Sequence, residues 1–162
     1  MAITSFDPRN PRIVPANGVP QIVQNLLEAN SQSFKAGELV QLASGAVSVA
    51  AAGDAPVMGI ALADATNVSA SNASIPVMII KPDDEVFIQV SDGSGSLETA
   101  TTTCKAGVAY DIEVTSGLHT LASDDTTNPK FVFIDAIYDA AGSAGYWARV
   151  RPYYLENQPT AG

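Results

Sequence analysis

The sequence predicts a mainly β fold: a small β-rich domain built from repeated hairpins, with an extended N-terminal arm. Three observations lead to this prediction. A sequence motif typical of a hairpin occurs twice, the composition suits short strands joined by turns, and prolines are frequent in the first twenty residues. The chain has 12 Gly and 10 Pro, and much of its 46% hydrophobic content is Ala and Val. Such a composition does not suit a helical bundle.

The repeated phrase is F-K-A-G-E-L-V-Q-L-A-S-G-A-V-S-V at 34–49 and C-K-A-G-V-A-Y-D-I-E-V-T-S-G-L-H-T-L at 104–121. Each copy reads as a turn glycine, an alternating strand, a Ser-Gly turn and a short returning strand. The second copy carries two more residues before its Ser-Gly turn. The chain is therefore expected to contain the same hairpin twice.

Residues 1–20 form the predicted arm. They include Pro8, Pro11, Pro15 and Pro20, and each proline biases its own φ and its predecessor toward extended conformations. We expect this segment to bury little within its own domain. It is either a disordered terminus or an extended segment that lies across a neighbouring surface, with its apolar residues as contacts.

Residues 21–162 are expected to form a single β-rich domain. At 21–31 the spacing of the apolar residues fits a short helix and an irregular strand equally well. Strands are predicted at 38–43, 46–50, 56–62, 75–80, 85–91, 108–114, 118–121, 130–138 and 145–153.

Charge and composition restrict the function. The net charge is −9, and all of the excess lies after residue 33. An acidic body argues against nucleic-acid binding, because phosphate recognition needs clustered Lys and Arg. No apolar run approaches the length of a membrane span, and the N-terminus lacks the order of a signal peptide. The lone cysteine excludes an intrachain disulfide.

Two residues are candidates for catalysis. His119 is the only histidine, and it lies on the returning strand of the second hairpin with no nucleophile at a suggestive spacing. Cys104 precedes Lys105, a cation that could lower the pKa of the thiol. However, Phe34 occupies the equivalent place in the first copy, which favours a packing position for the cysteine. We therefore expect both side chains to be structural, and the protein not to be an enzyme.

Metal and cofactor binding have little support in the sequence. Asp83, Asp84 and Glu85 could supply oxygen ligands, but successive strand residues face opposite ways and the spacing of a calcium loop is missing. An acidic turn is the favoured interpretation. The phosphate-loop, zinc-protease and nucleophile-elbow motifs do not occur, so no cofactor is expected.

The segment Y-W-A-R-V-R-P-Y-Y at 146–154 has the composition of a binding surface. Strand alternation places Trp147, Arg149 and Arg151 on one face, and Tyr146 with its apolar neighbours on the other. Trp, Tyr and Arg dominate binding hot spots. The alternative interpretation is a strand with one face in the core and the other in solvent.

Phe34-Lys35-Ala36-Gly37, then Glu38-Leu39-Val40, Ser44-Gly45 and Val57-Met58-Gly59-Ile60-Ala61 follow one another in a distinctive order. This progression resembles the capsid cement, or head decoration, proteins of tailed bacteriophages. The likeness is best over 28–62, weaker through 75–90, and recurs around 104–114. Residues 1–27 and the C-terminal third match only in general character, and the long aromatic C-terminal segment departs from the smallest relatives.

The resemblance implies a compact β-barrel-like or β-clip fold, as in some relatives. It also implies a structural protein on the outer surface of a virion capsid, made in the cytoplasm of the host bacterium. Its partners would be the phage major capsid protein and further copies of itself, with a trimer favoured and a dimer possible. It would clamp capsid subunits after the shell has expanded, often through an N-terminal arm. The candidate interface residues are Phe6, Arg9, Arg12, Ile13, Val14, Trp147, Arg149, Arg151, Tyr153 and Tyr154.

Two other functions remain open at this point. An exposed aromatic platform beside acidic residues would favour a carbohydrate- or receptor-binding β module on a virion or cell surface. A small enzyme subunit would have to use Cys104 or His119.

Overall fold

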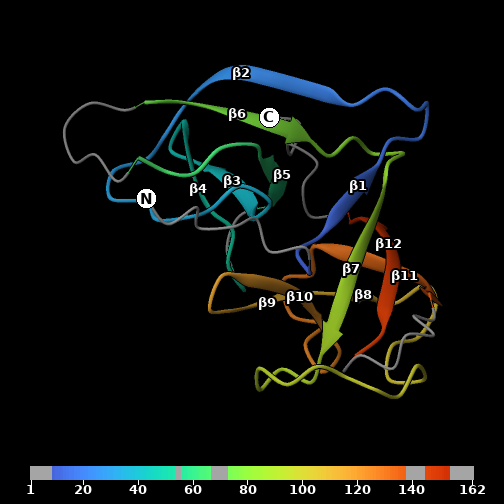
Figure 1. Cartoon of the computed structure of the whole chain (residues 1–162). Helices are drawn as coiled ribbons and strands as arrows, with labels where there is room; N and C mark the ends of the chain where they lie inside the picture. The colour runs from blue at the N-terminus through green and yellow to red at the C-terminus, as the bar shows by residue number, and fades with distance from the viewer. Residues whose placement is uncertain (1–8, 54–55, 67–72, 138–144, 154–162) are drawn as a thin grey trace, which may run out of the picture.

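The computed structural model describes residues 9–53, 56–66, 73–137 and 145–153, in which all regular structure is β-strand (Figure 1). The strands form a five-stranded sheet and a seven-stranded sheet that nearly closes into a barrel. The mainly β, barrel-like fold expected from the sequence is confirmed.

The five-stranded sheet contains the earlier strands, in the spatial order β2-β6-β5-β3-β4. Their bounds are β2 Gln21–Leu27, β3 Leu39–Ala43, β4 Ala46–Val49, β5 Val57–Ala61 and β6 Ser74–Ile79. The seven-stranded sheet has the order β8-β11-β12-β7-β10-β9, with β1 paired to β7. Its strands are β1 Arg12–Val14, β7 Glu85–Ser91, β8 Ala109–Tyr110, β9 Ile112–Thr115, β10 Leu118–Ala122, β11 Phe131–Ile137 and β12 Trp147–Pro152.

The two Ser-Gly turns have the same geometry. Ser44 and Gly45 have φ values of 50° and 81°, and Ser116 and Gly117 have 51° and 80°. Positive φ at both central residues is the type I′ turn, whose twist matches that of the two strands it joins. Each turn closes a two-residue hairpin, β3 to β4 and β9 to β10. The predicted duplication of the hairpin is confirmed.

The Lys-Ala-Gly turns are also duplicated. The Glu38 N–H donates to the Lys35 carbonyl at 3.1 Å, and the Val108 N–H donates to the Lys105 carbonyl at 3.1 Å. The turn glycines, Gly37 and Gly107, each have a positive φ and each donate their N–H to the strand that follows the hairpin, at 2.8 and 2.9 Å. The glycine is needed because other residues rarely adopt this conformation.

The duplication extends well beyond the repeated phrase. β6 pairs antiparallel with β2 and with β5, and β12 pairs in the same way with β7 and β11. The returning strand then meets the first strand in parallel, through the isolated bridge Glu28–Val47 in one half and the β10–β7 pair in the other. We call residues 21–80 the first half and residues 85–152 the second half. β2 and β7 hold equivalent places in them.

One predicted strand is interrupted. The expected strand at 108–114 is divided into β8 and β9 at Asp111. Before this residue the chain pairs with β11, and after it with β10. Asp111 itself donates its N–H to the Asp125 carbonyl at 2.9 Å and accepts from Ala122 at 3.0 Å. The break therefore lies where the strand changes partners.

In the segment at 21–31, which fitted helix or strand, residues Gln21–Leu27 form the strand β2. β2 pairs with β6 over most of its length, with a shift of register between Val23 and Leu26. That irregularity explains the spacing of the apolar residues, because a bulge places two successive residues against one partner and disturbs the alternation.

The part of the arm that the structure describes is incorporated in the fold, contrary to the expectation that it buries little within its own domain. Arg12, Ile13 and Val14 pair antiparallel with Phe87, Val86 and Glu85. Ile13 packs against the main hydrophobic core, and Asn10 is 2% exposed. The reason is long-range pairing with β7, which the arm's own sequence pattern does not reveal.

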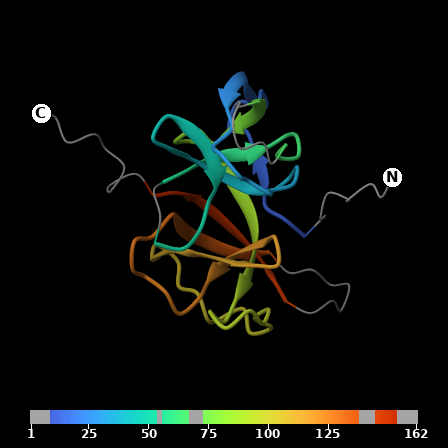
Figure 2. The same ribbon diagram turned by 90° about the vertical axis from the view of Figure 1, so that its left-hand side faces the viewer.

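The main hydrophobic core joins the two halves. It contains Leu39, Ile60 and Ile80 from the first half together with the apolar residues of the barrel, among them Val86 and Phe131. A smaller cluster belongs to the first half alone and includes Phe34, Val40 and Val77. Viewed from the side, the first half lies above the barrel, with β7 running down from one into the other (Figure 2).

Candidate functional site

The outer face of four neighbouring strands, β1, β7, β12 and β11, gathers four of the ten predicted interface residues. Arg12 lies opposite Phe87, Phe87 opposite Arg149, and Arg149 opposite Asp135. Paired residues in adjacent strands point to the same side of a sheet. The face therefore carries a row of arginine, phenylalanine, arginine and aspartate, which we call the arginine face.

The arginines of this face are held by carboxylates and an aromatic ring. Arg149 donates from Nε and Nη2 to the two oxygens of Asp135 at 2.8 and 2.7 Å, and these bonds raise the pKa of the guanidinium. Glu85 lies 3.7 Å from both Arg149 and Arg151. The Arg12 guanidinium lies 5.6 Å from the centroid of the Trp147 ring, within the range of a cation–π contact.

Two buried polar residues anchor the arm beside this face. The Asn10 side chain accepts from the His119 N–H at 2.9 Å and donates to the Gly117 carbonyl at 3.1 Å. The Asp84 carboxylate is 1% exposed, and it accepts from the backbone N–H groups of Ala16 and Lys81 at 3.0 and 2.9 Å. Residues 10–16 are thus fixed at both ends.

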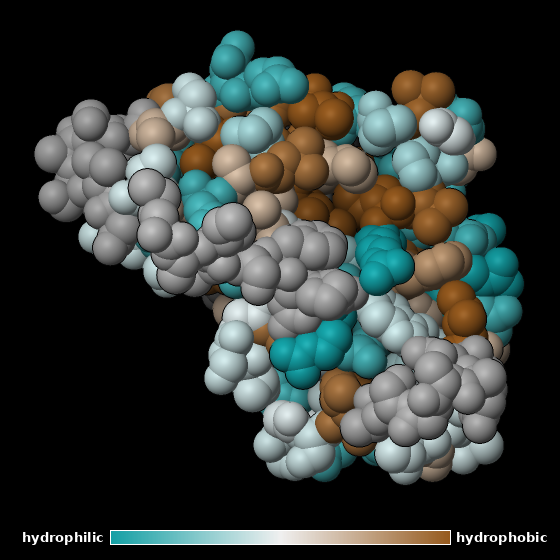
Figure 3. Space-filling model, viewed as in Figure 1, coloured by the Kyte–Doolittle hydropathy of each residue, from teal (hydrophilic) through white to brown (hydrophobic). Residues whose placement is uncertain are grey.

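An apolar groove of about 320 Å³ lies between the arm and the first half, lined by Pro11, Arg12, Ile13, Ile60, Leu62 and Met78 among others. Apolar residues gather on this side of the molecule below β2 and β6 (Figure 3). Arg12 belongs to both the groove and the arginine face. The two features are therefore continuous.

The structure brings together four of the predicted interface residues, namely Arg12, Trp147, Arg149 and Arg151. The predicted alternation of the last strand is confirmed, because Trp147, Arg149 and Arg151 are at least partly exposed while Ala148 and Val150 are fully buried. This strand thus matches the alternative interpretation as well, with one side in the core.

The other predicted interface residues are dispersed. Val14 is 40% exposed at the end of β1, whereas Ile13 points into the core. Arg9 is exposed, and Tyr153 is half-buried with its N–H donating to the Lys130 carbonyl at 2.9 Å. Phe6 and Tyr154 lie outside the described residues.

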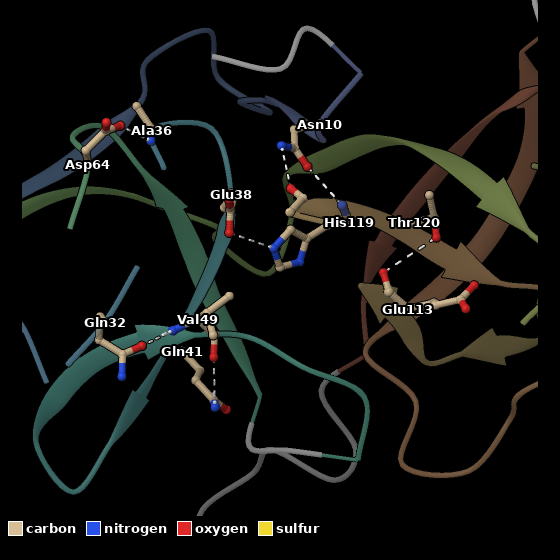
Figure 4. Close-up of polar contacts among 11 residues, drawn as sticks. Asn10, Gln32, Ala36, Glu38, Gln41, Val49, Asp64, Glu113, His119 and Thr120 are labelled. Carbon is tan, nitrogen blue, oxygen red and sulfur yellow. Dashed lines mark hydrogen bonds and ion pairs between the residues drawn. The ribbon is translucent and has the colours of Figure 1, made fainter. Parts of the chain in front are cut away.

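His119 is fully buried between the halves. Its Nε2 lies 3.5 Å from the Glu38 carboxylate, and its N–H is held by Asn10 (Figure 4). Neither ring nitrogen has a hydrogen bond among the described residues. A cavity of about 390 Å³ beside it is lined by Glu38, Ser116 and Gly117 among others. The geometry fits a packed strand histidine, one of the two structural roles, solvated or packed, that the sequence favours over catalysis.

Cys104 is a buried packing residue, as its equivalence to Phe34 predicts. The two side chains are 5% and 2% exposed. Burial raises the pKa of the Cys104 thiol, and it also raises that of Tyr146 to about 12. The Tyr146 and Thr103 hydroxyls are 2.8 Å apart. A thiol with a raised pKa is a poor nucleophile at neutral pH.

The acidic turn at 83–85 has structural roles, because Asp84 holds the arm and Glu85 holds two arginines. Within the described residues, no group of three or more His, Cys, Asp or Glu side chains could hold a metal ion. None of the described residues forms a helix long and apolar enough to cross a membrane.

Sequence reasoning missed three residues of this site: Asn10, Glu85 as an arginine partner, and Asp135. The Asn10 contacts join residues 107 and 109 positions apart, which no local pattern can indicate. Asp135 had a usable signal, since it interrupts an otherwise apolar strand, F-V-F-I-D-A-I, and its strand precedes the arginine-bearing one.

Comparisons with protein-family models, with curated proteins and with solved structures find no match to this chain.

Proposed function

We propose that this protein is a capsid cement protein: a non-enzymatic structural protein that binds the outer surface of a phage major capsid protein shell and stabilises the expanded head. The observation that carries the proposal is the fixed arm beside an interface-like face. Asn10 and Asp84 hold residues 10–16 against the barrel, next to the arginine face and the apolar groove.

A cement protein must add contact area between subunits that are already assembled, and the stability of the shell then rises by mass action. An extended arm supplies such area with little folded mass. Here the arm's base is already ordered by β1, so residues 10–14 lose no further conformational freedom on binding. Residues 1–9 would then provide the contacts that extend beyond the body.

The arginine face suits a protein partner. Trp and Arg are enriched at the centres of interfaces, and a polar rim surrounds a more apolar centre. Arg151 is 60% exposed in its side chain, and the groove beside Arg12 supplies the apolar component. The acidic remainder of the surface would face solvent and limit unwanted association.

Carbohydrate binding needs an open aromatic face on which a sugar ring can stack. Trp147 is the only tryptophan, and the Arg12 guanidinium lies over its ring. This arrangement gives the carbohydrate-binding alternative no specific support. Glycan-array binding by the isolated protein would reverse that judgement.

The test is the occupancy of capsids by variants, measured by electron microscopy of heads incubated with purified protein. We expect deletion of residues 1–8 to lower occupancy while β1 stays in place. A deletion of 1–20 would be a poor test, because it removes β1 from the barrel. The charge reversal Arg151→Glu should also lower occupancy, since it changes the exposed end of the arginine face.

Lys35→Glu is the matched control. Lys35 has a side chain 40% exposed and lies on the Lys-Ala-Gly turn of the first half, outside the arginine face. It should leave occupancy unchanged. Full occupancy by both the deletion and Arg151→Glu would contradict the proposal, and so would failure of the unaltered protein to bind any head.

A further inference from the structure

The first half ends in an open sheet edge. β2 pairs with β6 along one side, and on its other side the described residues provide only the Glu28–Val47 bridge beyond its end. In the part of the chain that the structure describes, no strand covers the outer side of 21–25. β2 lies at the outer limit of the ribbon in both views (Figures 1 and 2).

The second half shows how the same edge is covered elsewhere in this fold. Val86 of β7 pairs with Val150, as Val23 of β2 pairs with Val77. On the free side of β7, β1 lies antiparallel with Ile13 opposite Val86. The place opposite Val23 holds no strand of the described residues. One of two equivalent edges is thus covered by a strand of the same chain, and the other is not covered by any strand in the part that the structure describes.

β2 itself carries none of the side chains that protect natural edges from pairing. Such edges commonly carry lysine, proline or inward-pointing charges. Residues 13–27 contain no charged side chain. Val19, Ile22 and Leu27 are 63%, 41% and 48% exposed, which is half of the large exposed hydrophobic residues in the described structure. An additional strand would bury part of this apolar surface.

We propose that this edge pairs with the same edge of a second copy of the chain, β2 antiparallel to β2, so that one sheet continues across a twofold axis. The net charge of −9 makes two copies repel each other over most of their surface. The β2 edge avoids this repulsion, since residues 13–27 and the residues of the adjoining strand β6 are all uncharged.

Two copies of the same strand edge can also pair each other's backbone N–H and C=O groups. In a twofold antiparallel pair each strand supplies the same donors and acceptors, so the contact is closed and does not grow into a fibre. The bulge between Val23 and Leu26 limits the regular part of the edge, which suits a short pairing between two copies. The inference concerns the purified chain and does not depend on the proposed function.

The test is the mass of the full chain in solution, measured by sedimentation velocity over a range of concentrations. A small interface of this kind predicts a dimer with a Kd on the order of micromolar. Ile22→Lys places a charge on an exposed position of β2 and should weaken the dimer at least tenfold. Gln24→Lys, at another exposed β2 position, should do the same if the first variant folds poorly.

Leu42→Lys is the matched control, because Leu42 is 44% exposed but lies on β3, away from the open edge. It should leave the dimer intact. Amide hydrogen exchange gives a second measurement: the protection of Ile22 and Gln24 should rise with protein concentration in the unaltered chain only.

A chain that stays monomeric, or that forms a trimer, would overturn the inference. So would a dimer that tolerates both β2 variants, or one that Leu42→Lys disrupts equally. A monomer whose β2 variants lose only capsid binding would show that the edge serves a different protein, and would overturn the pairing between copies.

Discussion

The two halves of the chain share their turns and strand order but differ in how they are completed. The second half closes nearly into a barrel, and β1 covers the free side of its β7. The first half has a hydrophobic cluster of its own, and no strand of the described residues covers the equivalent side of β2. The same backbone plan thus serves as an enclosed unit in one place and as a unit with a free edge in the other.

Equivalent positions show where the sequences diverged. The Ala50 N–H donates to the Leu39 carbonyl, and the Ala122 N–H donates in the same way to Asp111. Leu39 and Asp111 are both buried, so an apolar side chain in one half corresponds to a charged one in the other. Duplication preserved the backbone contacts, while the side chains that fill the interior were free to change.

The largest expected effect comes from the charged position. Lys130 Nζ lies 3.1 Å from the Asp111 carboxylate, and the two side chains are 3% and 1% exposed. Lys130→Met would leave a buried carboxylate without its cation, which costs about 3–5 kcal/mol. The double variant Asp111→Leu, Lys130→Met replaces the buried ion pair by apolar side chains, as Leu39 does at the equivalent place in the first half. It should recover most of the lost free energy of unfolding. Urea unfolding measures both, and equal losses in the single and double variants would contradict the comparison.

Gly59 gives the next largest effect. A Cβ at this position would lie 2.1 Å from the Met78 carbonyl oxygen, so β5 and β6 would have to separate. Gly59→Ala should therefore reduce the free energy of unfolding by about 3 kcal/mol. The equivalent residue in the second half is Phe131, which its own strand pair accommodates. A loss of unfolding free energy below about 1 kcal/mol, roughly that of a surface substitution, would contradict this. It would show that β5 and β6 accommodate a side chain at this position as readily as β11 and β12 do.

The two type I′ turns offer a paired test of smaller size. Gly45→Ala meets nothing within 4 Å and should cost only the left-handed conformation, about 1 kcal/mol. Gly117→Ala has the same φ penalty, but its Cβ would lie 2.9 Å from the Glu38 Oε1. Moving that carboxylate, which ends a flexible side chain and lies 3.5 Å from His119 Nε2, should add about 0.5 kcal/mol. Thermal unfolding of the two variants provides the measurement, and equal costs would indicate that the carboxylate moves freely.

The smallest effect concerns pH. The Ala36 N–H donates to the Asp64 carboxylate at 2.9 Å, and this bond, with help from Lys35, lowers the pKa of Asp64. A lowered pKa contributes stability above the unfolded value, about pH 4, and that contribution is lost as the pH falls. Because the side chain is 41% exposed, Asp64→Asn should cost only a few tenths of a kcal/mol at pH 7.

The second half supplies the control for this prediction. Its Lys-Ala-Gly turn is held by the Tyr110 hydroxyl, which accepts from the Lys105 N–H at 3.0 Å. Tyr110→Phe removes that bond without removing a carboxylate, so its cost should not change between pH 3 and pH 7. If the loss of stability in Tyr110→Phe varied with pH as it does in Asp64→Asn, titration of the Asp64 carboxylate could not be the cause of the pH dependence.

Local patterns predicted much of this fold. The Lys-Ala-Gly and Ser-Gly phrases identified both hairpins because the required positive φ values leave a trace in the sequence. Alternation identified the two sides of β12. β1 was missed, since three residues are too few for an alternation and their stability comes from β7. The break at Asp111 was missed because it depends on which strand lies beside the chain.

The candidate site was predicted only in part for the same reason. Trp147, Arg149 and Arg151 lie on one strand, where spacing is informative. Their partners Glu85 and Asp135 come from two other strands, and only the sheet order places them together. Asn10 reaches across more than a hundred residues to the second hairpin.

The anchoring of the arm by Asn10 also imposes an order on biosynthesis. Asn10 leaves the ribosome early, but its partners at Gly117 and His119 are translated more than a hundred residues later. Domain elements emerge from the N-terminus onward, so β7 and Asp84 are available to hold residues 12–16 well before the partners of Asn10 exist. A nascent chain that stops before the second hairpin can therefore pair β1 but cannot seat Asn10, and the complete docking of the arm is a mark of a finished molecule.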